Sequence, residues 1–225
     1  MNIDFHAHFL PKADHGSDSV SMSLRQLALA QDAEIDLLAA TPHFYPKKDT
    51  AEAFLERRKE SYAALCKEWT GKTPILRLGA EVHLCRGLEH LPELKQLCLR
   101  GTNLLLLELP GDFRMSTYQS TLESLLYDCK IRPILAHVDR YNPDTIEALF
   151  HMGFSGQLNA SALCRLFGRK RCLRWIEEGH IVALGSDLHG VKPGYAEFMQ
   201  VRKQFPRHYE TIQVRCKELL YEASK

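Results

Sequence analysis

The sequence predicts an α/β fold in which βα units surround a parallel sheet or barrel. Short apolar runs alternate with longer segments of helical period, and this alternation is typical of parallel α/β folds. A second observation is the series of His, Asp and Glu residues at the ends of the apolar runs. In α/β barrels the C-terminal strand ends meet on the face that carries the active site, so these residues are candidates for one shared site.

The elements follow one another in a regular order. Seven strands are expected, at residues 2–7, 35–41, 75–83, 103–109, 133–138, 154–159 and 181–186. Helical patterns lie at residues 19–32, 49–69, 91–99, 116–129, 143–151, 161–178 and 194–223. No repeat, low-complexity tract or linker divides the 225 residues, a length that suits one barrel-sized domain. We therefore expect a single domain spanning residues 1–225.

The composition excludes several classes of protein. With 29 basic and 28 acidic residues the formal net charge is +1, so no broad positive field is available for nucleic acid or an anionic membrane. The 7 cysteines are odd in number and include no CxxC pair, which indicates reduced, mostly buried thiols and no disulfide framework. No signal peptide pattern is present and no apolar run approaches the roughly 20 residues of a membrane span, so we expect a cytoplasmic protein without membrane insertion.

The first predicted strand carries the pattern Asp4, His6, His8. Side chains at i and i+2 of a strand point to the same side, with Cα atoms about 6 to 7 Å apart, so both imidazoles reach one metal ion. Asp4 points the same way one step further back, where we expect it to orient a ligating imidazole.

The later strands end in further potential ligands. These are His43 after the second strand, Glu81 and His83 in the third, Glu108 in the fourth, His137 in the fifth with Asp139 and Arg140 just after it, and Asp187 and His189 after the seventh. Glu108 lies alone in an apolar run, where a carboxylate is costly unless it is paired or bound to a cation. The ligand types favour Zn, Mn or Fe over Mg or Ca.

Each of these residues also has a plainer interpretation, because a single His or Glu near a strand end is commonly a hydrogen-bonded structural residue. The histidines expected to be structural or solvent-facing are His83, His90, His151, His180 and His208. The basic run GRKR at 168–171 is expected to be the solvated start of a helix, with a contact to a phosphopeptide or sugar phosphate as the alternative. As a set, however, the strand ends indicate a multinuclear metal site.

The ordered motifs DFHAH, TPHFYP, GAEVHL, LLLELP, PILAHVDRY, GQLNASAL and GSDLHG resemble those of the PHP (polymerase and histidinol phosphatase) superfamily. Within it, the chain is most similar to the bacterial metal-dependent protein-tyrosine phosphatases of capsule and exopolysaccharide clusters. The resemblance runs from residue 2 to about residue 190. It implies a distorted (β/α)7 barrel of the PHP type, similar to a TIM barrel, that holds two or three divalent metal ions. The resemblance implies manganese as the metal, with iron or zinc as alternatives.

The resemblance also implies a ligand set. One metal ion would be bound by His6, His8, Glu81 and Asp187, a second by Glu81, Glu108 and His137, and a third by His43, His189 and the residue at the position of His15. The related phosphatases have DDG where this chain has Asp14-His15-Gly16. The change keeps a ligand and removes a negative charge, and the choice between Asp14 and His15 as the third-site ligand stays open.

The activity that the resemblance implies is phosphomonoester hydrolysis assisted by metal ions. Arg140 is the candidate for a bidentate phosphate clamp, with a salt bridge to Asp139 as the alternative. The family has a second Arg after the Asp-x-His motif, and here Lys192, a cation without bidentate geometry, occupies that region. No Cys is followed by Arg at the sixth position and no GxxxxGK[ST] loop is present, which argues against thiolate-phosphatase and P-loop NTPase chemistry.

Three hypotheses for the function follow. The first is a cytoplasmic phosphatase for phosphotyrosine proteins, with a bacterial tyrosine kinase of polysaccharide export as its partner, and this partner rests on the resemblance alone. The second is a small-molecule phosphatase of the histidinol-phosphate type, which is favoured by large insertions that this compact chain lacks. The third is a non-catalytic metal-binding regulatory domain, which the near-complete ligand set disfavours. The sequence leaves the oligomeric state open.

Overall fold

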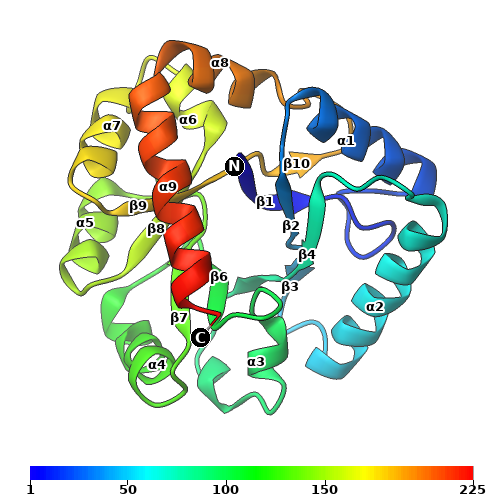
Figure 1. Cartoon of the computed structure of the whole chain (residues 1–225). Helices are drawn as coiled ribbons and strands as arrows, with labels where there is room; N and C mark the ends of the chain where they lie inside the picture. Colours follow the sequence, from blue (N-terminus) through cyan, green and yellow to red (C-terminus); the bar gives the residue numbers. More distant parts are fainter. Residues whose placement is uncertain (225) are drawn as a thin grey trace.

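The predicted alternation of strands and helices is present in the structure, a computed structural model in which residues 1–224 are described (Figure 1). The strands are β1 (Ile3–His8), β2 (Leu37–Ala40), β3 (His43–Phe44), β4 (Ile75–Leu78), β5 (Glu81–His83), β6 (Leu104–Glu108), β7 (Arg132–Leu135), β8 (Ser155–Asn159), β9 (Ile181–Gly185) and β10 (Leu188–His189). All strand pairs among the described residues are parallel. The predicted α/β class is therefore confirmed.

The strands form two parallel sheets arranged around a common axis (Figure 1). One sheet has the order β10-β1-β2-β4 and the other has the order β3-β5-β6-β7-β8-β9. Just beyond β9, the N–H of Asp187 donates to the carbonyl of His6 on β1 at 2.8 Å, so the end of the second sheet meets the first. The longer strands therefore follow one another around the barrel in chain order, and their C-terminal ends lie at one end of it.

The strand expected at 75–83 is divided in two, which corrects the sequence prediction. β4 pairs with β2, whereas β5 pairs with β3 and β6. At the break, the N–H of Gly79 donates to the carbonyl of Ala40 at 2.8 Å, and the chain then changes neighbours. The two-residue strands β3 and β10 lie outside the prediction, because two residues show no alternation that a pattern could detect.

The helices lie mostly where their periodicity predicts them. They are α1 (Val20–Asp32), α2 (Ala51–Glu68), α3 (Leu94–Leu97), α4 (Met115–Tyr127), α5 (Pro143–His151), α6 (Ala160–Cys164), α7 (Arg169–Glu177), α8 (Ala196–Gln204) and α9 (Pro206–Glu222), with short 3-10 turns η1 (Leu88–His90) and η2 (Val138–Arg140). The side chains of Ser19 and Thr50 cap α1 and α2 by accepting from a backbone N–H in the first turn. Asn142 caps α5, whose first turn contains Pro143.

Three of the predicted helices differ from the observed ones. The segment 161–178 forms α6 and α7, which are separated at residues 165–168, and Gly168 there has a φ of 80°. The segment 194–223 forms α8 and α9, because Pro206 has no N–H to continue the first helix and instead starts the second. Within 91–99 a single turn, α3, is α-helical.

The barrel interior is a small apolar cluster between the strands and α9. It includes Ile3 and Phe5 of β1 together with Cys216 and Leu219 of α9. The side chain of Gln213 accepts from the N–H of Ile3 at 2.6 Å and donates to its carbonyl at 3.1 Å. Helix α9 therefore closes the N-terminal end of the barrel (Figure 1), and the strand ends with the candidate ligands lie at the other end.

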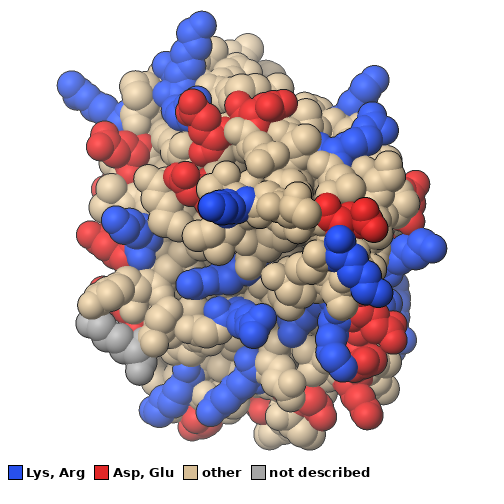
Figure 2. All heavy atoms as spheres, turned by 45° about the vertical axis from the view of Figure 1, so that its right-hand side comes forward, with Lys and Arg blue, Asp and Glu red and all other residues tan. Residues whose placement is uncertain are grey.

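The surface carries charges of both signs. On the face in Figure 2, Asp and Glu side chains lie among Lys and Arg, and the basic side chains are denser toward the centre. All 7 cysteines are free thiols, as expected, and those that are buried are Cys85, Cys98, Cys172 and Cys216. Within residues 1–224, no helix combines the length and the apolar character that a membrane span requires.

Candidate metal centre

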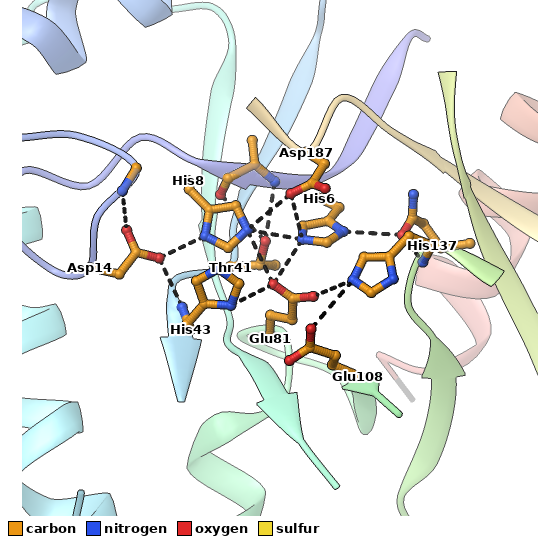
Figure 3. A network of polar contacts seen from close by, with 12 residues as sticks. His6, His8, Asp14, Thr41, His43, Glu81, Glu108, His137 and Asp187 are labelled. Atoms are coloured by element: carbon orange, nitrogen blue, oxygen red, sulfur yellow. Dashed lines mark hydrogen bonds and ion pairs between the residues drawn. The ribbon is translucent and has the colours of Figure 1, made fainter. Parts of the chain in front are cut away.

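The polar residues at the strand ends meet at the C-terminal end of the barrel (Figure 3). They are His6 and His8 of β1, His15 of the loop after β1, His43 of β3, Glu81 of β5, Glu108 of β6, His137 after β7, Asp187 after β9 and His189 of β10. The structure thus brings together side chains from segments far apart in the sequence. The innermost of them, His6, His8, Glu81 and His137, are buried.

Hydrogen bonds define the tautomers of the two histidines on β1. His8 Nδ1 lies 2.6 Å from a carboxylate oxygen of Asp14, so Nδ1 carries the proton of the neutral ring. His6 Nδ1 lies 3.1 Å from Oε1 of Gln157, which also accepts from the N–H of His137 at 2.8 Å. Because a backbone N–H only donates, that Gln157 atom is the amide oxygen and His6 Nδ1 is its second donor. The Nε2 atoms of both neutral rings therefore present lone pairs.

These two lone pairs face each other in the interior of the cluster. The Nε2 atoms of His6 and His8 are 2.9 Å apart. One carboxylate oxygen of Glu81 lies 3.2 Å from each of them. One oxygen of Asp187 lies 3.6 Å from His6 Nε2 and 3.5 Å from His8 Nε2. Electron-rich atoms packed this closely and away from solvent repel one another unless a proton or a metal ion lies between them.

Glu81 is the centre of a second group. Its Oε1 accepts from Nε2 of His137 at 2.8 Å, and its Oε2 lies 2.9 Å from Nδ1 of His43. The second contact lacks hydrogen-bond geometry, so both of its buried atoms are without a hydrogen-bond partner. One oxygen of Glu108 lies 3.9 Å from His137 Nε2, and the other lies 3.0 Å from Nδ1 of His83. His43, Glu81 and Glu108 offer atoms close enough together to hold one metal ion.

A third group consists of His8, His43 and His189. Nδ1 of His189 donates to the carbonyl of Asp187 at 3.0 Å, so its Nε2 presents a lone pair, and this buried atom has no hydrogen-bond partner. The ring of His15 stacks on the rings of His43 and His189, with centroids 4.9 and 4.6 Å apart. His15 therefore lies at the open side of this group.

Asp14 and His15 are placed differently. One Asp14 oxygen accepts from His8 Nδ1 at 2.6 Å and from the N–H of His43 at 2.9 Å. The other oxygen accepts from the N–H of Gly16 at 2.9 Å. Asp14 thus orients His8, whereas the ring of His15 is exposed beside the third group.

The charges in the cluster shift the pKa values of its members. Burial alone would lower the pKa of His8, but Asp14 and Glu81 raise it to about 10. Burial alone would raise the pKa of both acids, yet the neighbouring imidazoles hold the pKa of Glu81 well below its usual range and bring that of Asp187 to about 2. Burial and the charge of His8 lower the pKa of His189 to about 4. Without a metal ion at neutral pH, His8 therefore holds a proton where a cation would otherwise lie.

The two cations predicted to bind phosphate occupy different positions. The guanidinium of Arg140 forms an ion pair with Asp187, and its side chain is 48% exposed. A salt bridge from Arg140 to Asp139 is not formed, which corrects that alternative, since an Asp139 oxygen instead accepts from the N–H of Asn159 at 3.3 Å. Lys192 lies in the exposed loop after β10, and no hydrogen bond or ion pair within residues 1–224 joins it to the cluster.

Asp4 is predicted to orient a ligating imidazole, but its carboxylate contacts the backbone of His6 and accepts from that N–H at 3.2 Å. Its carboxylate accepts from the N–H and the hydroxyl of Ser186 at 2.9 and 2.6 Å, and from the hydroxyl of Tyr195 at 2.8 Å. Asp4 therefore ties β1 to the segment that leads into the last ligands. The imidazoles of His6 and His8 are instead oriented by Gln157 and Asp14. From the sequence, Asp14 is a candidate third-site ligand and not an orienting residue, and Gln157 is not singled out because an amide is not a typical metal ligand.

Most of the remaining histidines lie away from the cluster, as expected. His90 and His151 are exposed, His180 stacks on Phe150 at 4.5 Å, and His208 lies 3.1 Å from Glu177. His83 differs, because its contact with Glu108 makes it a positioning residue of the site. The run at 168–171 starts α7, as predicted.

The fold and the donor set together define a class of protein. Imidazole nitrogens and carboxylate oxygens at the C-terminal end of a parallel α/β barrel are suited to divalent Mn, Fe or Zn. Buried atoms of His43, Glu81 and His189 that lack a hydrogen-bond partner fit such ions as well. This is the fold of metal-dependent phosphatases, with potential metal-binding groups in place.

The chain matches the family described as "Capsular polysaccharide synthesis, CpsB/CapC" over residues 2–224, and it belongs to that family. It is 22% identical over 205 residues to the tyrosine-protein phosphatase CpsB of Streptococcus agalactiae, covering 84% of this chain and 83% of that protein. The predicted resemblance to capsule-cluster phosphatases is therefore confirmed.

Solved structures agree with this assignment. The chain superposes with a TM-score of 0.77 and 25% identity on a structure from a study of YwqE from Bacillus subtilis and CpsB from Streptococcus pneumoniae, described as unique metal-dependent tyrosine phosphatases. The match covers 97% of this chain and 94% of that one. A phosphotriesterase homology protein from Escherichia coli shares the fold, with a TM-score of 0.53 and 13% identity over 97% of both chains.

Proposed function

We propose that this chain is a metal-dependent phosphomonoesterase that hydrolyses phosphotyrosine in proteins. The observation that carries the proposal is the pair of Nε2 atoms of His6 and His8, which lie 2.9 Å apart beside the carboxylates of Glu81 and Asp187. This arrangement is favourable around a divalent cation. The similarity to tyrosine-protein phosphatase CpsB supports the substrate class.

The geometry supports the ligand set that the resemblance implies. The proposed sets are His6, His8, Glu81 and Asp187 for one ion, Glu81, Glu108 and His137 for a second, and His15, His43 and His189 for a third. The tightest groups of donor atoms overlap with these sets: they are His6, His8 and Asp187, then His43, Glu81 and Glu108, and then His8, His43 and His189. Manganese is the proposed metal, with iron or zinc as alternatives for the same donors. Divalent ions bound there supply Lewis acidity to the phosphoryl oxygens and lower the pKa of the attacking water.

The chain's own residues orient the ligands and hold the substrate. Asp14 and Gln157 keep His8 and His6 in the tautomers that turn their Nε2 lone pairs inward. Arg140 lies at the edge of the cluster, and its half-exposed guanidinium has N–H groups available for two phosphoryl oxygens. In the proposal, Lys192 supplies a second, non-bidentate positive charge from the loop after β10.

The proposed protein substrate is a bacterial tyrosine kinase that controls polysaccharide export. Membership of a capsular polysaccharide synthesis family supports this partner. The proposed compartment is the cytoplasm, where the 7 free cysteines remain reduced.

The test is phosphate release from a phosphotyrosine peptide and from histidinol phosphate by protein stripped of metal and resupplied with manganese, iron or zinc. We expect manganese to restore turnover, with the peptide preferred over histidinol phosphate. His6→Ala/His8→Ala should abolish turnover, whereas the control His90→Ala/His151→Ala changes exposed histidines and should leave it intact. A preference for histidinol phosphate would favour a small-molecule phosphatase. Stoichiometric metal binding without turnover of either substrate would indicate a regulatory domain.

A further inference from the structure

The loop between α6 and α7 carries the most exposed large apolar side chains within residues 1–224. Leu166 is 78% exposed and Phe167 is 94% exposed. Single exposed apolar residues are common on proteins, but these two are adjacent and project from the same loop. At this exposure, Phe167 packs in no groove of its own chain.

Basic residues lie on both sides of this apolar pair. Arg165 precedes it, and Arg169, Lys170 and Arg171 form the first turn of α7, which contains no acidic residue. The positive end of a helix macrodipole favours acidic side chains in this turn and disfavours basic ones. The charge arrangement is therefore unfavourable for α7 alone, and it becomes favourable when an anionic surface lies against the loop.

The carboxylates of the chain leave these cations unpaired. The guanidinium of Arg169 lies 5.6 Å from the ring of Phe205, and that of Arg171 lies 5.2 Å from the ring of Trp175. Arg165 donates to a neutral hydroxyl of its own helix. None of the four cations that flank the apolar pair lies within ion-pair distance of a carboxylate in the described chain, and the nearby carboxylate Glu147 pairs with Arg174 instead.

We propose that this loop, residues 165–171, is a docking site for an anionic lipid bilayer. Leu166 and Phe167 enter the interface between headgroups and acyl chains, and the flanking cations contact lipid phosphates. The shape of this loop favours a bilayer over an acidic protein as the partner. Its two projecting apolar side chains form no concave or flat patch for a folded protein, whereas a fluid lipid interface accommodates them. The chain as a whole has a net charge of +1, and the four loop cations exceed it, so the rest of the molecule is net negative and does not attract an anionic surface. This loop therefore determines how the protein lies on the membrane.

The position of the loop links it to the metal centre. Helix α6 starts directly after Asn159, whose amide donates to Asp187 at 3.1 Å. The loop follows at the end of this short helix. A bilayer bound there would keep the C-terminal end of the barrel close to the membrane surface.

The test is co-sedimentation of the full chain with vesicles of phosphatidylcholine alone or of phosphatidylcholine with phosphatidylglycerol. We expect binding to the anionic vesicles and much less to the neutral ones, with a decrease as salt concentration rises. Leu166→Ser/Phe167→Ser should abolish binding. Arg165→Ser/Lys170→Ser should lower the partition coefficient about 25-fold, at about fivefold for each cation removed.

Matched controls change exposed residues elsewhere. Ile75→Ser/Tyr127→Ser removes two other exposed apolar side chains, and Lys67→Ser/Lys72→Ser removes two other exposed cations. Both variants should sediment like the unmodified protein, and circular dichroism checks that every variant is folded. Because the readout is binding, the experiment gives a result whether or not the phosphatase proposal holds.

Two outcomes overturn the proposal. One is failure of the unmodified chain to sediment with anionic vesicles, and the other is equal sedimentation of Leu166→Ser/Phe167→Ser. If vesicles retain neither protein but this variant slows dephosphorylation of a phosphorylated kinase and not of a short peptide, the loop binds a protein and the membrane proposal is wrong.

Discussion

At the scale of single residues, the partner of each imidazole decides what the imidazole offers to a metal ion. Asp14 and Gln157 accept hydrogen bonds from Nδ1 of His8 and His6, which turns both Nε2 lone pairs into the cluster. Residue type and strand spacing place the histidines in the candidate site, but they do not show these partners. Asp4 is an example. Alternation along the strand places its side chain on the same side as the imidazoles, but it does not show that the carboxylate accepts from the backbone N–H of His6 and from Ser186 and not from a ring.

Asp14→Ala tests this orienting role. The substitution removes the acceptor of His8 Nδ1, so the ring is free to adopt the other tautomer and to rotate. We expect the affinity for manganese to fall by about 10- to 100-fold with the fold retained. Titration calorimetry measures the affinity, and Asp18→Ala, an exposed carboxylate of the same loop, is the control. Equal affinities of the two variants would show that Asp14 does not orient a ligand.

A second residue-scale prediction concerns pH. Asp14 and Glu81 raise the pKa of buried His8 from 6.5 to about 10. In the metal-free protein at neutral pH, both nitrogens of the His8 ring therefore carry a proton. A metal ion must displace one of these protons, and the apparent affinity for manganese should therefore rise between about pH 6 and pH 9. Calorimetry in two buffers with different ionisation enthalpies measures the proton release. Binding without proton release would contradict the prediction.

The same pKa predicts how the metal-free protein responds to pH. The folded-state pKa of His8 is raised above its ordinary value of 6.5, so its contribution to stability is complete below that pH. It is lost as the pH rises through about 10. Urea unfolding of metal-free protein should therefore show a falling midpoint on the alkaline side, and His8→Ala should flatten this dependence.

At the scale of elements, the long helices and strands could be predicted and the breaks between them could not. The caps Ser19 and Thr50 mark the starts of α1 and α2, and these helices lie close to their predicted ranges. The division of the segment 75–83 depends on which strand each half pairs with, and that is decided by tertiary contacts. One-turn and two-residue elements have too few residues for a periodic pattern.

Close packing between elements also shapes the metal centre. A Cβ on Gly185 of β9 would lie 2.6 Å from Cβ of His6 and 2.6 Å from Nε2 of Gln157. The absence of a side chain there lets β9 approach β1 and lets Gln157 reach His6. This glycine is therefore required by space and not by a special backbone angle.

Gly185→Ala should disturb both the fold and the site. Because Cβ of His6 belongs to a buried strand, the added methyl group forces a backbone shift, and we expect a loss of about 1 to 3 kcal/mol in the free energy of unfolding. Bound manganese, measured by metal analysis, should fall as well. Gly111→Ala is the matched control, since a Cβ there meets nothing within 4 Å. An unchanged metal content in Gly185→Ala would show that the close approach of β9 to His6 is not needed for metal binding.

At the scale of the whole molecule, the barrel has one open end and one closed end. Buried side chains of α9 cover the N-terminal strand ends, with Leu219 only 4% exposed, while the candidate ligands lie at the opposite end. Helical periodicity predicts a helix in this part of the chain, but it does not show which surface the helix covers. The last helix thus supports the strands that carry the ligands without contacting the ligands themselves.

Leu219→Ala tests this separation of stability from site. The cavity beneath α9 should reduce the free energy of unfolding by about 2 to 4 kcal/mol, whereas Val214→Ala, on the 48% exposed side of the same helix, should change it by less than about 0.5 kcal/mol. If residues 1–225 form a single domain, as we propose, fluorescence and circular dichroism will report one shared unfolding transition in both variants. Metal content in the folded state should stay unchanged, because the substitution lies at the other end of the barrel. Separate transitions for the two signals would mean that α9 unfolds independently and does not close the barrel as part of one cooperative unit.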